Sequence, residues 1–480
     1  MSLGRKAVRG TLWVAGGTYV NSLQNFLTNI LLMRLIAPEY FGVLALALTL
    51  LTLGQKLFSF GFNHALIHRQ EELESAVRVH QLLHLISSLA VLALIGLLAP
   101  IIEAHYDRDT MIVLVIVAVS AIAQTAGNTP RIRLEKELDF SPVMKVGAVS
   151  TLAGNVVGIA AALLGGGVWA LVARLVVADV SGTVGYFVAL KQAPAFRWDW
   201  QLVRWYYRFG AYLWLSGMAT WVVLKFDDLL VGSMISTEEL GYYARAYALA
   251  CLPTTMVTHV VAKVAFPLYA RLQDDREKLS YAFRSAMGWM VLLTMPLAVG
   301  LALLAREFVF ILVGETWAPM IPVMQLLLIY ASLRPMFDNT GELFTAVGNP
   351  KYSGLVQLAQ AVAVIVLCPW MTWLWGAEGA AVAVGLVMAV GVFLAYRKLP
   401  RYVDFSFREL MLLPAAASVV GFLAVLLALS VYPVENLYGR FFFKGVVFVV
   451  GFVLTLALVS GKKYVQQIKT FIRFAKTVKE

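Results

Sequence analysis

About fourteen blocks of apolar residues, each roughly twenty residues long, follow one another along the whole chain. A helix needs about 20 residues to cross the hydrocarbon core of a bilayer. Inside a bilayer every backbone amide must find its hydrogen bond within the protein, and a helix achieves this by itself. The sequence therefore predicts an all-α polytopic membrane protein with about fourteen transmembrane helices.

The predicted spans use nearly all of the 480 residues, which leaves no room for a soluble catalytic domain. Their ends are placed to within about 2–4 residues. The segment 304–318 is too short to cross a bilayer and is expected to lie at the interface or to dip into the membrane. We expect the spans at 12–36, 41–63, 78–102, 110–130, 141–164, 168–190, 207–234, 239–268, 280–304, 319–347, 352–374, 377–397, 408–431 and 440–461.

Basic residues gather in alternate connections between these spans. One set of connections includes the N-terminus, the C-terminal tail, Lys191 and Arg401, whereas the opposite set holds little beyond residues such as Arg34 and Arg108. The positive-inside rule then predicts that both termini are cytoplasmic, which requires an even number of spans. Because the net charge of +11 is distributed in this way, it does not indicate a nucleic-acid partner.

Both ends of the chain carry further signals. The first block contains Asn21, Gln24, Asn25 and Asn29, which is too polar for a cleaved signal segment, so we expect the N-terminus to be retained. The tail 462–480 alternates basic and apolar residues, which predicts a cytoplasmic helix at the surface of anionic lipid. Binding of a partner protein is the alternative for this tail.

A short internal repeat relates the two halves of the chain. The segment 35–42 resembles the segment 234–241, with Glu39 paired to Glu238 and Gly42 to Gly241. Both segments join an outward-going span to its successor, and the offset of 199 residues corresponds to six spans. An even offset predicts two halves in the same orientation, related by an axis along the membrane normal. Chance similarity is the alternative.

Thr18, Asn21, Asn25 and Asn29 form one polar stripe on the first predicted span. Hydrogen bonding between helices is one explanation. Since Gln24 adds to the stripe, we favour the wall of a water-lined cavity.

Charged residues at membrane depth are costly and indicate function or mutual pairing. Snorkelling or neutralisation within one helix would explain some of them. The excess of basic over acidic residues favours an anionic ligand, and Arg suits phosphate in particular. The basic residues are Lys56, Lys145, Arg174, Lys225, Arg245, Lys263 and Arg334, and the acidic ones are Asp179, Asp227, Asp228, Asp338 and Glu342.

No metal or cofactor site is expected. The six histidines show no metal-ligand spacing, and His80 and His84 are expected to serve packing or to lie at the surface. The glycine run 165–167 is not followed by Lys and Ser or Thr, as a phosphate-binding loop would require. Cys251 and Cys368 both lie in apolar blocks and imply no disulfide.

In the stretches RLIAPEYFG at 34–42 and DDLLVG at 227–232, the chain resembles the Wzx-type polysaccharide and O-antigen flippases of the multidrug/oligosaccharidyl-lipid/polysaccharide exporter superfamily. The stretch 34–42, RLIAPEYFG, is similar to the joint between the first two spans of that family. The stretch 227–232, DDLLVG, followed by LGYY at 240–243, is similar to a second family segment. Many relatives carry Asn or Arg near position 225, where this chain has Lys225.

The resemblance implies two six-helix lobes, 1–195 and 196–400, helices 13 and 14 at 401–461, and the tail 462–480. It implies a flippase in the bacterial cytoplasmic membrane that moves a polyprenyl-pyrophosphate-linked oligosaccharide to the outer leaflet by alternating access. Membrane lipid, a coupling H⁺ or Na⁺ and polysaccharide-assembly proteins are the implied partners. A drug/cation antiporter of the same superfamily, in which acidic residues would dominate the cavity, and a membrane glycosyltransferase or polymerase are the alternatives.

The candidate site residues follow from these patterns together. We expect the headgroup-binding residues to face a shared central cavity and the acidic residues to act in gating or ion coupling. The former are Lys225, Arg334, Arg174, Lys56, Lys263, Asn21, Asn25 and Asn29, and the latter are Asp179, Asp227, Asp228, Asp338 and Glu342. No residue is assigned a catalytic role.

Overall fold

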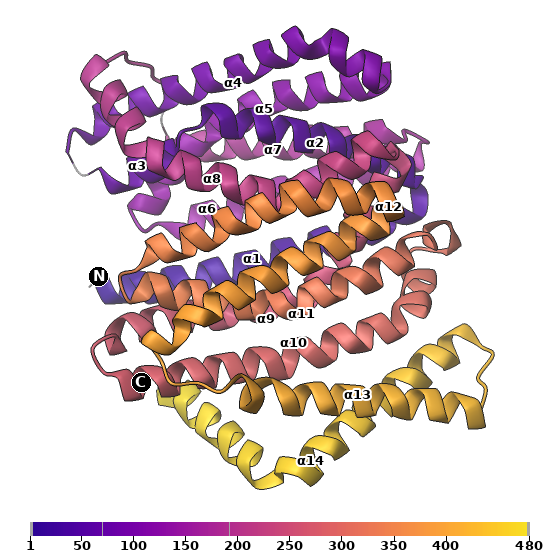
Figure 1. The fold of residues 1–480 in the computed structure, drawn as a ribbon. Coiled ribbons are helices and arrows are strands. Elements are labelled where there is room, and N and C mark those ends of the chain that lie inside the picture. The colour runs from indigo at the N-terminus through magenta and orange to yellow at the C-terminus, as the bar shows by residue number, and fades with distance from the viewer. Residues whose placement is uncertain (1–2, 70, 192, 478–480) are drawn as a thin grey trace. The chain divides into compact units, whose positions relative to one another are not determined.

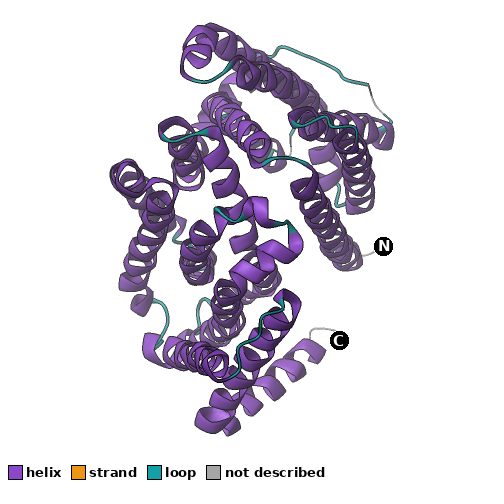
Figure 2. Cartoon of the chain, turned by 90° about the vertical axis from the view of Figure 1, so that its right-hand side faces the viewer, coloured by secondary structure: helices purple, strands orange, loops and turns teal. Residues whose placement is uncertain are grey.

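The computed structural model describes residues 3–69, 71–191 and 193–477, which form helices and loops with no β-strand among them (Figure 2). Side chains are described for these residues except 3–12, 15, 212, 256, 259–260, 263, 409 and 460–477. The basic residues near the N-terminus, Lys263 and the basic tail 462–480 therefore lie outside the described side chains.

The chain divides into two compact units, Met1–Ala244 and Arg245–Glu480. The first unit contains α1 (Leu3–Leu35), α2 (Pro38–Phe58), α3 (Phe62–His68), α4 (Leu73–His105), α5 (Arg108–Lys136), α6 (Phe140–Leu163), α7 (Val168–Leu190) and α8 (Trp200–Met234) (Figure 1). The second contains most of α9 (Thr237–Leu272), then α10 (Arg276–Leu312), η1 (Glu315–Trp317), α11 (Met320–Ala346), α12 (Pro350–Lys398), η2 (Leu399–Arg401), α13 (Phe407–Val431) and α14 (Leu437–Thr477).

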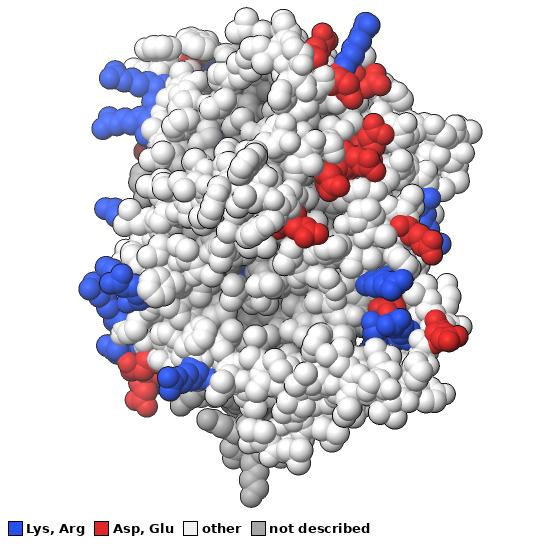
Figure 3. All heavy atoms as spheres, turned by 45° about the vertical axis from the view of Figure 1, so that its right-hand side comes forward, with Lys and Arg blue, Asp and Glu red and all other residues white. Residues whose placement is uncertain are grey.

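Each unit has its own apolar core. In the first unit one core lies between α2, α4, α5 and α7, and a smaller one joins α3 and α4 to α8. In the second unit the core lies between α9, α10, α11 and α12, and α13 and α14 pack on each other and against α10 (Figure 1). Charged side chains gather toward the helix ends and leave a broad uncharged band on the face drawn in Figure 3. This distribution suits helices that cross a bilayer.

Every predicted span overlaps a helix, and the predicted all-α membrane fold is confirmed. Among the described residues, ten helices are long and apolar enough to cross a membrane, or eleven with the bent helix α8. The count omits α1 and α9, and it includes α12, which holds two predicted spans, as one helix. The number of fourteen crossings stays a prediction.

Helix α12 changes direction where the sequence predicts a boundary between two spans. Trp375 and Gly376 have non-helical backbone angles inside this helix, and Gly376 has a φ of +61°. A side chain at position 376 would disfavour that left-handed conformation, so the glycine permits the break. The two predicted spans 352–374 and 377–397 correspond to the two arms of α12.

The residues 304–318 are divided between the end of α10 and a short turn. Helix α10 continues to Leu312 and is followed by η1, in which Trp317 is fully buried. Glu307, near the end of α10, is buried and bound by basic residues of α14, more than a hundred residues away in the sequence. The location of this segment relative to the membrane stays a prediction.

The two copies of the internal repeat contact each other inside the first unit. A Cβ on Gly42 would lie 1.6 Å from the carbonyl oxygen of Thr237, and one on Gly241 would lie 2.0 Å from that of Pro38. Pro38 and Thr237 are separated by the same 199 residues as Gly42 and Gly241. The contact is therefore reciprocal, as across a two-fold axis, and both glycines are needed for it.

Candidate functional site

Arg174 on α7 holds the polar stripe of the first predicted span against two other helices. Its Nη1 donates to Asn29 Oδ1 at 2.7 Å, and its Nη2 donates to Asn25 Oδ1 at 2.8 Å, both on α1. Its Nε donates to Asn155 Oδ1 of α6 at 2.8 Å. The rigid fork of the guanidinium suits three acceptors in different directions.

Small residues on α6 allow Arg174 to reach this position. Gly154 and Gly158 are one turn apart, and a Cβ on Gly154 would lie 2.4 Å from the carbonyl oxygen of Arg174. A Cβ on Gly158 would lie 2.7 Å from the Arg174 side chain. Close approach through such glycine pairs is typical of packed membrane helices. Asn21, another member of the stripe, lies outside this network, and its buried Oδ1 accepts no hydrogen bond from a described residue.

Asp179 lies on the same helix as Arg174 but has different partners. Ser120 Oγ donates to its Oδ2 at 2.9 Å, and Gln124 Nε2 donates to its Oδ1 at 3.0 Å. Both donors belong to α5. Asp179 therefore joins α7 to α5, whereas Arg174 joins α7 to α1 and α6.

Three charged residues of α8 form a compact group in the first unit. Lys225 Nζ lies 2.6 Å from Asp228 Oδ2, one turn along the helix. The Asp228 side chain is 7% exposed, whereas that of Lys225 stays 46% exposed. The neighbouring Asp227 points away and accepts a hydrogen bond from Tyr243 Oη at 2.6 Å. Asp228 thus anchors the ammonium of Lys225, while nearly half of the Lys225 side chain stays exposed.

Arg334, Asp338 and Glu342 follow one face of α11 in the second unit. Arg334 Nε lies 3.5 Å from Asp338 Oδ2, and its guanidinium lies 6.0 Å from the ring centre of Tyr330. The Arg334 side chain is 25% exposed. Glu342 forms no ion pair with a described residue, and its Oε2 is buried without a hydrogen-bond partner.

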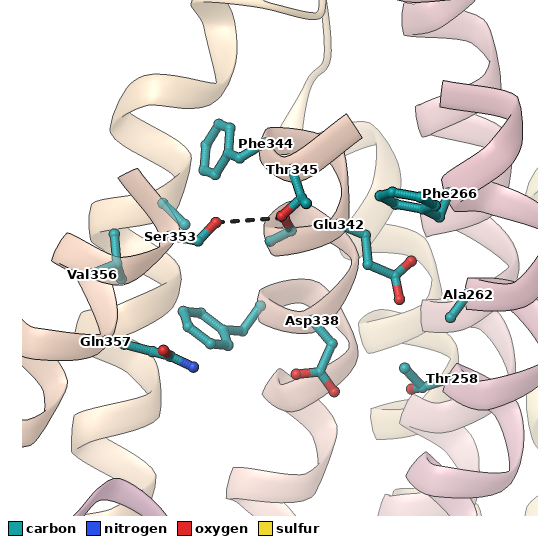
Figure 4. A pocket seen from close by; sticks show the side chains of 13 residues that line it. Thr258, Ala262, Phe266, Asp338, Glu342, Phe344, Thr345, Ser353, Val356 and Gln357 are labelled. Atoms are coloured by element: carbon teal, nitrogen blue, oxygen red, sulfur yellow. Dashed lines mark hydrogen bonds between the residues drawn. The ribbon is translucent and has the colours of Figure 1, made fainter. Parts of the chain in front are cut away.

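Asp338 and Glu342 line a cavity of about 410 Å³ between α9, α11 and α12. Their carboxylates point toward the side of α9 that carries Thr258 and Ala262, as Figure 4 shows. The α12 wall adds Ser353 and Gln357, and Ser353 Oγ donates to the carbonyl oxygen of Gly341 at 3.4 Å. Carboxylate, hydroxyl and amide oxygens in one cavity suit a hard cation or a proton. This cavity of the second unit is lined by acidic residues, and the shared central cavity with excess positive charge stays a prediction.

Lys56 and Lys263 are the other two predicted binding cations, and Lys56 forms no hydrogen bond or ion pair with a described residue. Lys56 lies in the last turn of α2, its side chain is exposed, and it lies beside Gly217 of α8. The side chain of Lys263 is outside the described ones. The residues that share a network are Arg174 with Asn25 and Asn29, Lys225 with Asp228, and Arg334 with Asp338.

The sequence analysis assigned no role to Glu307 and expected His80 and His84 to serve packing or to lie at the surface, and all three are buried. Glu307 Oε1 of α10 lies 2.8 Å from Lys444 Nζ and 3.3 Å from Arg440 Nε, both on α14. His80 and His84 are buried, and Asn63 Oδ1 lies 3.2 and 2.8 Å from their Nε2 atoms. Because an amide oxygen only accepts, both imidazoles donate to it. The i, i+4 spacing of the histidines was the one signal that pointed to this cluster.

Comparison with known sequences identifies the family of the chain. A family model described as polysaccharide biosynthesis protein matches residues 31–322, which is more than half of the chain. The lipopolysaccharide biosynthesis protein WzxC of Escherichia coli (strain K12) is 25% identical over 356 residues, covering 72% of this chain and 71% of that protein. The succinoglycan biosynthesis transport protein ExoT of Rhizobium meliloti (strain 1021) is 27% identical over 306 residues, covering 63% and 61%.

Solved structures show the same fold. The lipid II flippase MurJ in an inward closed conformation has a TM-score of 0.76 at 13% identity, covering 93% of this chain and 98% of that one. An inward-facing multidrug resistance MATE family transporter has a TM-score of 0.59 at 14% identity, covering 80% and 95%. These likenesses concern the fold alone. Together with the sequence relatives they confirm the expected resemblance, and the chain belongs to the polysaccharide biosynthesis protein family.

Proposed function

We propose that the chain is a flippase that moves a polyprenyl-pyrophosphate-linked oligosaccharide from the cytoplasmic to the outer leaflet by alternating access. Family membership and a fold similar to that of a lipid II flippase support this function. The observation that carries it is Lys225, a cation on an apolar helix that stays 46% exposed although Asp228 anchors it. A charged residue within a membrane-spanning helix is energetically costly, and such residues mark functional sites.

The cationic residues bind the anionic headgroup in this proposal. Lys225 in the first unit and Arg334 in the second contribute the main charges, each oriented by a carboxylate one turn away. Arg174 acts with Asn25 and Asn29, and Asn21, Lys56 and Lys263 complete the proposed set. Arg binds phosphate in a bidentate manner and Lys as a point charge, so the two types have different roles.

Acidic residues supply ion coupling in the same proposal. The cavity lined by Asp338 and Glu342 takes an H⁺ or Na⁺, and binding of the ion would change the pairing of Asp338 with Arg334. Asp179, Asp227 and Asp228 serve gating in this proposal. Asp179 and Asp227 accept hydrogen bonds from side chains of other helices, whereas Asp228 pairs with Lys225 of its own helix. The chain has no catalytic role in this proposal.

The setting is the bacterial cytoplasmic membrane, with both termini in the cytoplasm. Membrane lipid and polysaccharide-assembly proteins are the proposed partners besides the substrate. The distribution of basic residues along the chain supports this orientation.

A transport assay with the full chain in proteoliposomes tests the proposal. Lipid-linked oligosaccharide placed in the inner leaflet should become accessible to an added glycosidase only when the protein is present. Lys225→Gln and Arg334→Gln should each slow this exposure several-fold, while Lys225→Arg should retain more activity if charge alone matters. Arg284→Gln is the control, because Arg284 is exposed and forms no ion pair with a described residue. No exposure of the glycan by the wild-type protein would refute the proposal.

A drug/cation antiporter is the second candidate, because the cavity of about 410 Å³ is acidic. A cationic dye loaded into the same vesicles distinguishes the two functions. Dye efflux driven by an ion gradient and abolished by Glu342→Gln, without movement of the glycan, would favour the antiporter. Glycan movement without dye efflux would favour the flippase.

A further inference from the structure

A groove of about 950 Å³ lies on the first unit, where the N-terminal part of α8 meets α4 and the turn before α3. It is large enough for a lipid headgroup and part of an acyl chain, since small-molecule sites span about 300–1,000 Å³. Its distinctive lining residues are Phe60, Trp198, Trp200, Arg204, Tyr207 and Arg208. None of them belongs to the site described above.

One wall of the groove is aromatic. The rings of Trp198 and Trp200 stack with centroids 5.8 Å apart, and the two side chains are 55% and 66% exposed. Phe60 and Tyr207 meet edge to face at 4.9 Å. Amphipathic aromatic rings of this kind are enriched where a membrane protein contacts lipid headgroups.

The groove is also positively charged, with no counter-ion for this charge among the described residues. Arg204 and Arg208 are one turn apart on α8, and both side chains are exposed and line the groove. Neither forms an ion pair with a described residue. The nearby Asp199 accepts hydrogen bonds from the backbone N–H groups of Gln201 and Leu202 and lies 3.9 Å from Arg197, so its carboxylate is already engaged.

The groove is held in shape by close packing of its floor. A Cβ on Gly210 would lie 1.7 Å from the carbonyl oxygen of Phe60, so α8 rests directly on the backbone of that turn. The apolar side is formed by α4, where Ile86 lines the groove and Leu89, one turn further along, is 48% exposed. The charged end therefore continues into an apolar surface.

We propose that this groove binds an anionic phospholipid of the membrane. The phosphate lies against the guanidinium groups of Arg204 and Arg208, the headgroup lies against the Trp198–Trp200 pair, and an acyl chain follows Ile86 and Leu89. An interfacial aromatic belt would explain the tryptophans alone. It would not explain two guanidinium groups that face the same groove without a carboxylate, which is the pattern of basic pockets for anionic headgroups. The proposal is independent of the transported substrate.

Native mass spectrometry of the full chain in detergent tests the site. Phosphatidylglycerol and phosphatidylcholine with identical acyl chains are titrated separately, and phosphatidylglycerol should bind more tightly. In Arg204→Gln/Arg208→Gln its affinity should fall about thirtyfold, whereas phosphatidylcholine binding should hardly change. Arg204→Lys/Arg208→Lys should retain most of the affinity, and the control Arg284→Gln should retain all of it. Thermal unfolding checks that the variants are folded. If the double Gln variant is unfolded, the single variants Arg204→Gln and Arg208→Gln replace it, and each should bind phosphatidylglycerol about fivefold more weakly than the wild type.

Three results would overturn the proposal. If the wild-type protein bound the two lipids equally, an interfacial aromatic belt would be sufficient to explain the groove. An equal loss in Arg284→Gln would mean that overall charge, and not this groove, attracts the lipid. Displacement of phosphatidylglycerol by an equimolar polyprenyl phosphate would assign the groove to the lipid-linked substrate.

Discussion

Arg174 and Lys225 are cations of the first unit with partners of different kinds. Arg174 donates to three amide oxygens on two helices, so its geometry ties helices together. Lys225 pairs with the carboxylate of Asp228 on its own helix, and its side chain remains 46% exposed. These contacts suggest that Arg174 contributes mainly to structure and Lys225 mainly to binding, although both carry one positive charge.

Arg174→Gln should lower the stability of the first unit. Asn25, Asn29 and the buried Asn155 would lose their shared donor, and each buried unsatisfied group costs about 1–3 kcal/mol. Arg174→Lys should restore only part of the stability, because an ammonium does not present the planar fork. The measurement is the thermal unfolding temperature of the protein in detergent. An unchanged unfolding temperature together with lost glycan movement would instead assign Arg174 to substrate binding alone.

Glu307, Arg440 and Lys444 show how a single element is attached to its unit. The carboxylate of Glu307 is 1% exposed, and Lys444 approaches it with only 10% of its side chain exposed. These contacts join α14 to α10 through two charged side chains that are almost fully buried in the protein. The ion cluster therefore adds electrostatic attachment to the apolar packing of α13 and α14 on α10.

Glu307→Ala should destabilise the second unit strongly, because breaking a buried pair costs about 3–5 kcal/mol when one charge is left behind. Glu307→Leu/Lys444→Met should be much closer to the wild type, since apolar replacement of both partners removes the stranded charge. Arg440 is 40% exposed and can be solvated in both variants. Thermal unfolding in detergent compares the three proteins. Equal stability of Glu307→Ala and the wild type would contradict an attachment role.

The joints α1–α2 and α8–α9 depend on two glycines for their mutual contact. Gly42→Ala or Gly241→Ala would place a methyl group within 2.0 Å of a backbone oxygen, so the helices must separate. We expect each variant to lower stability and glycan movement. Gly96→Ala is the matched control, because nothing lies within 4 Å of its added Cβ and alanine favours the helix. Wild-type behaviour of both joint variants would show that this contact is dispensable.

At the scale of the whole molecule, orientation in the membrane is the property to test. Reporter fusions at Lys191 and Arg401 should report the cytoplasm, and a fusion at Ser236 should report the outer side, because basic connections stay inside. At each site one fusion to alkaline phosphatase and a separate one to a fluorescent protein are made, so that each reporter controls the other. A reversed pattern at the three sites would exclude cytoplasmic termini.

Much of the architecture could be predicted from apolar block length. Each predicted span overlaps a helix, and even the boundary near Gly376 was located, because both features depend on local composition. Pairing between distant residues could not be predicted in this way. Glu307 pairs with Lys444 more than a hundred residues away, and the sequence does not show contacts between residues so far apart.

The sequence by itself determined the helical membrane class, the approximate spans and the residues that carry charge at depth, because a bilayer imposes the same length and polarity rules on every helix. Only the tertiary structure decided what those charges contact. The stripe on α1 meets Arg174, whereas Asp338 and Glu342 line an acidic cavity. Helical periodicity specifies the face of a helix on which a residue lies, but the partner of that face depends on packing between segments distant in the chain.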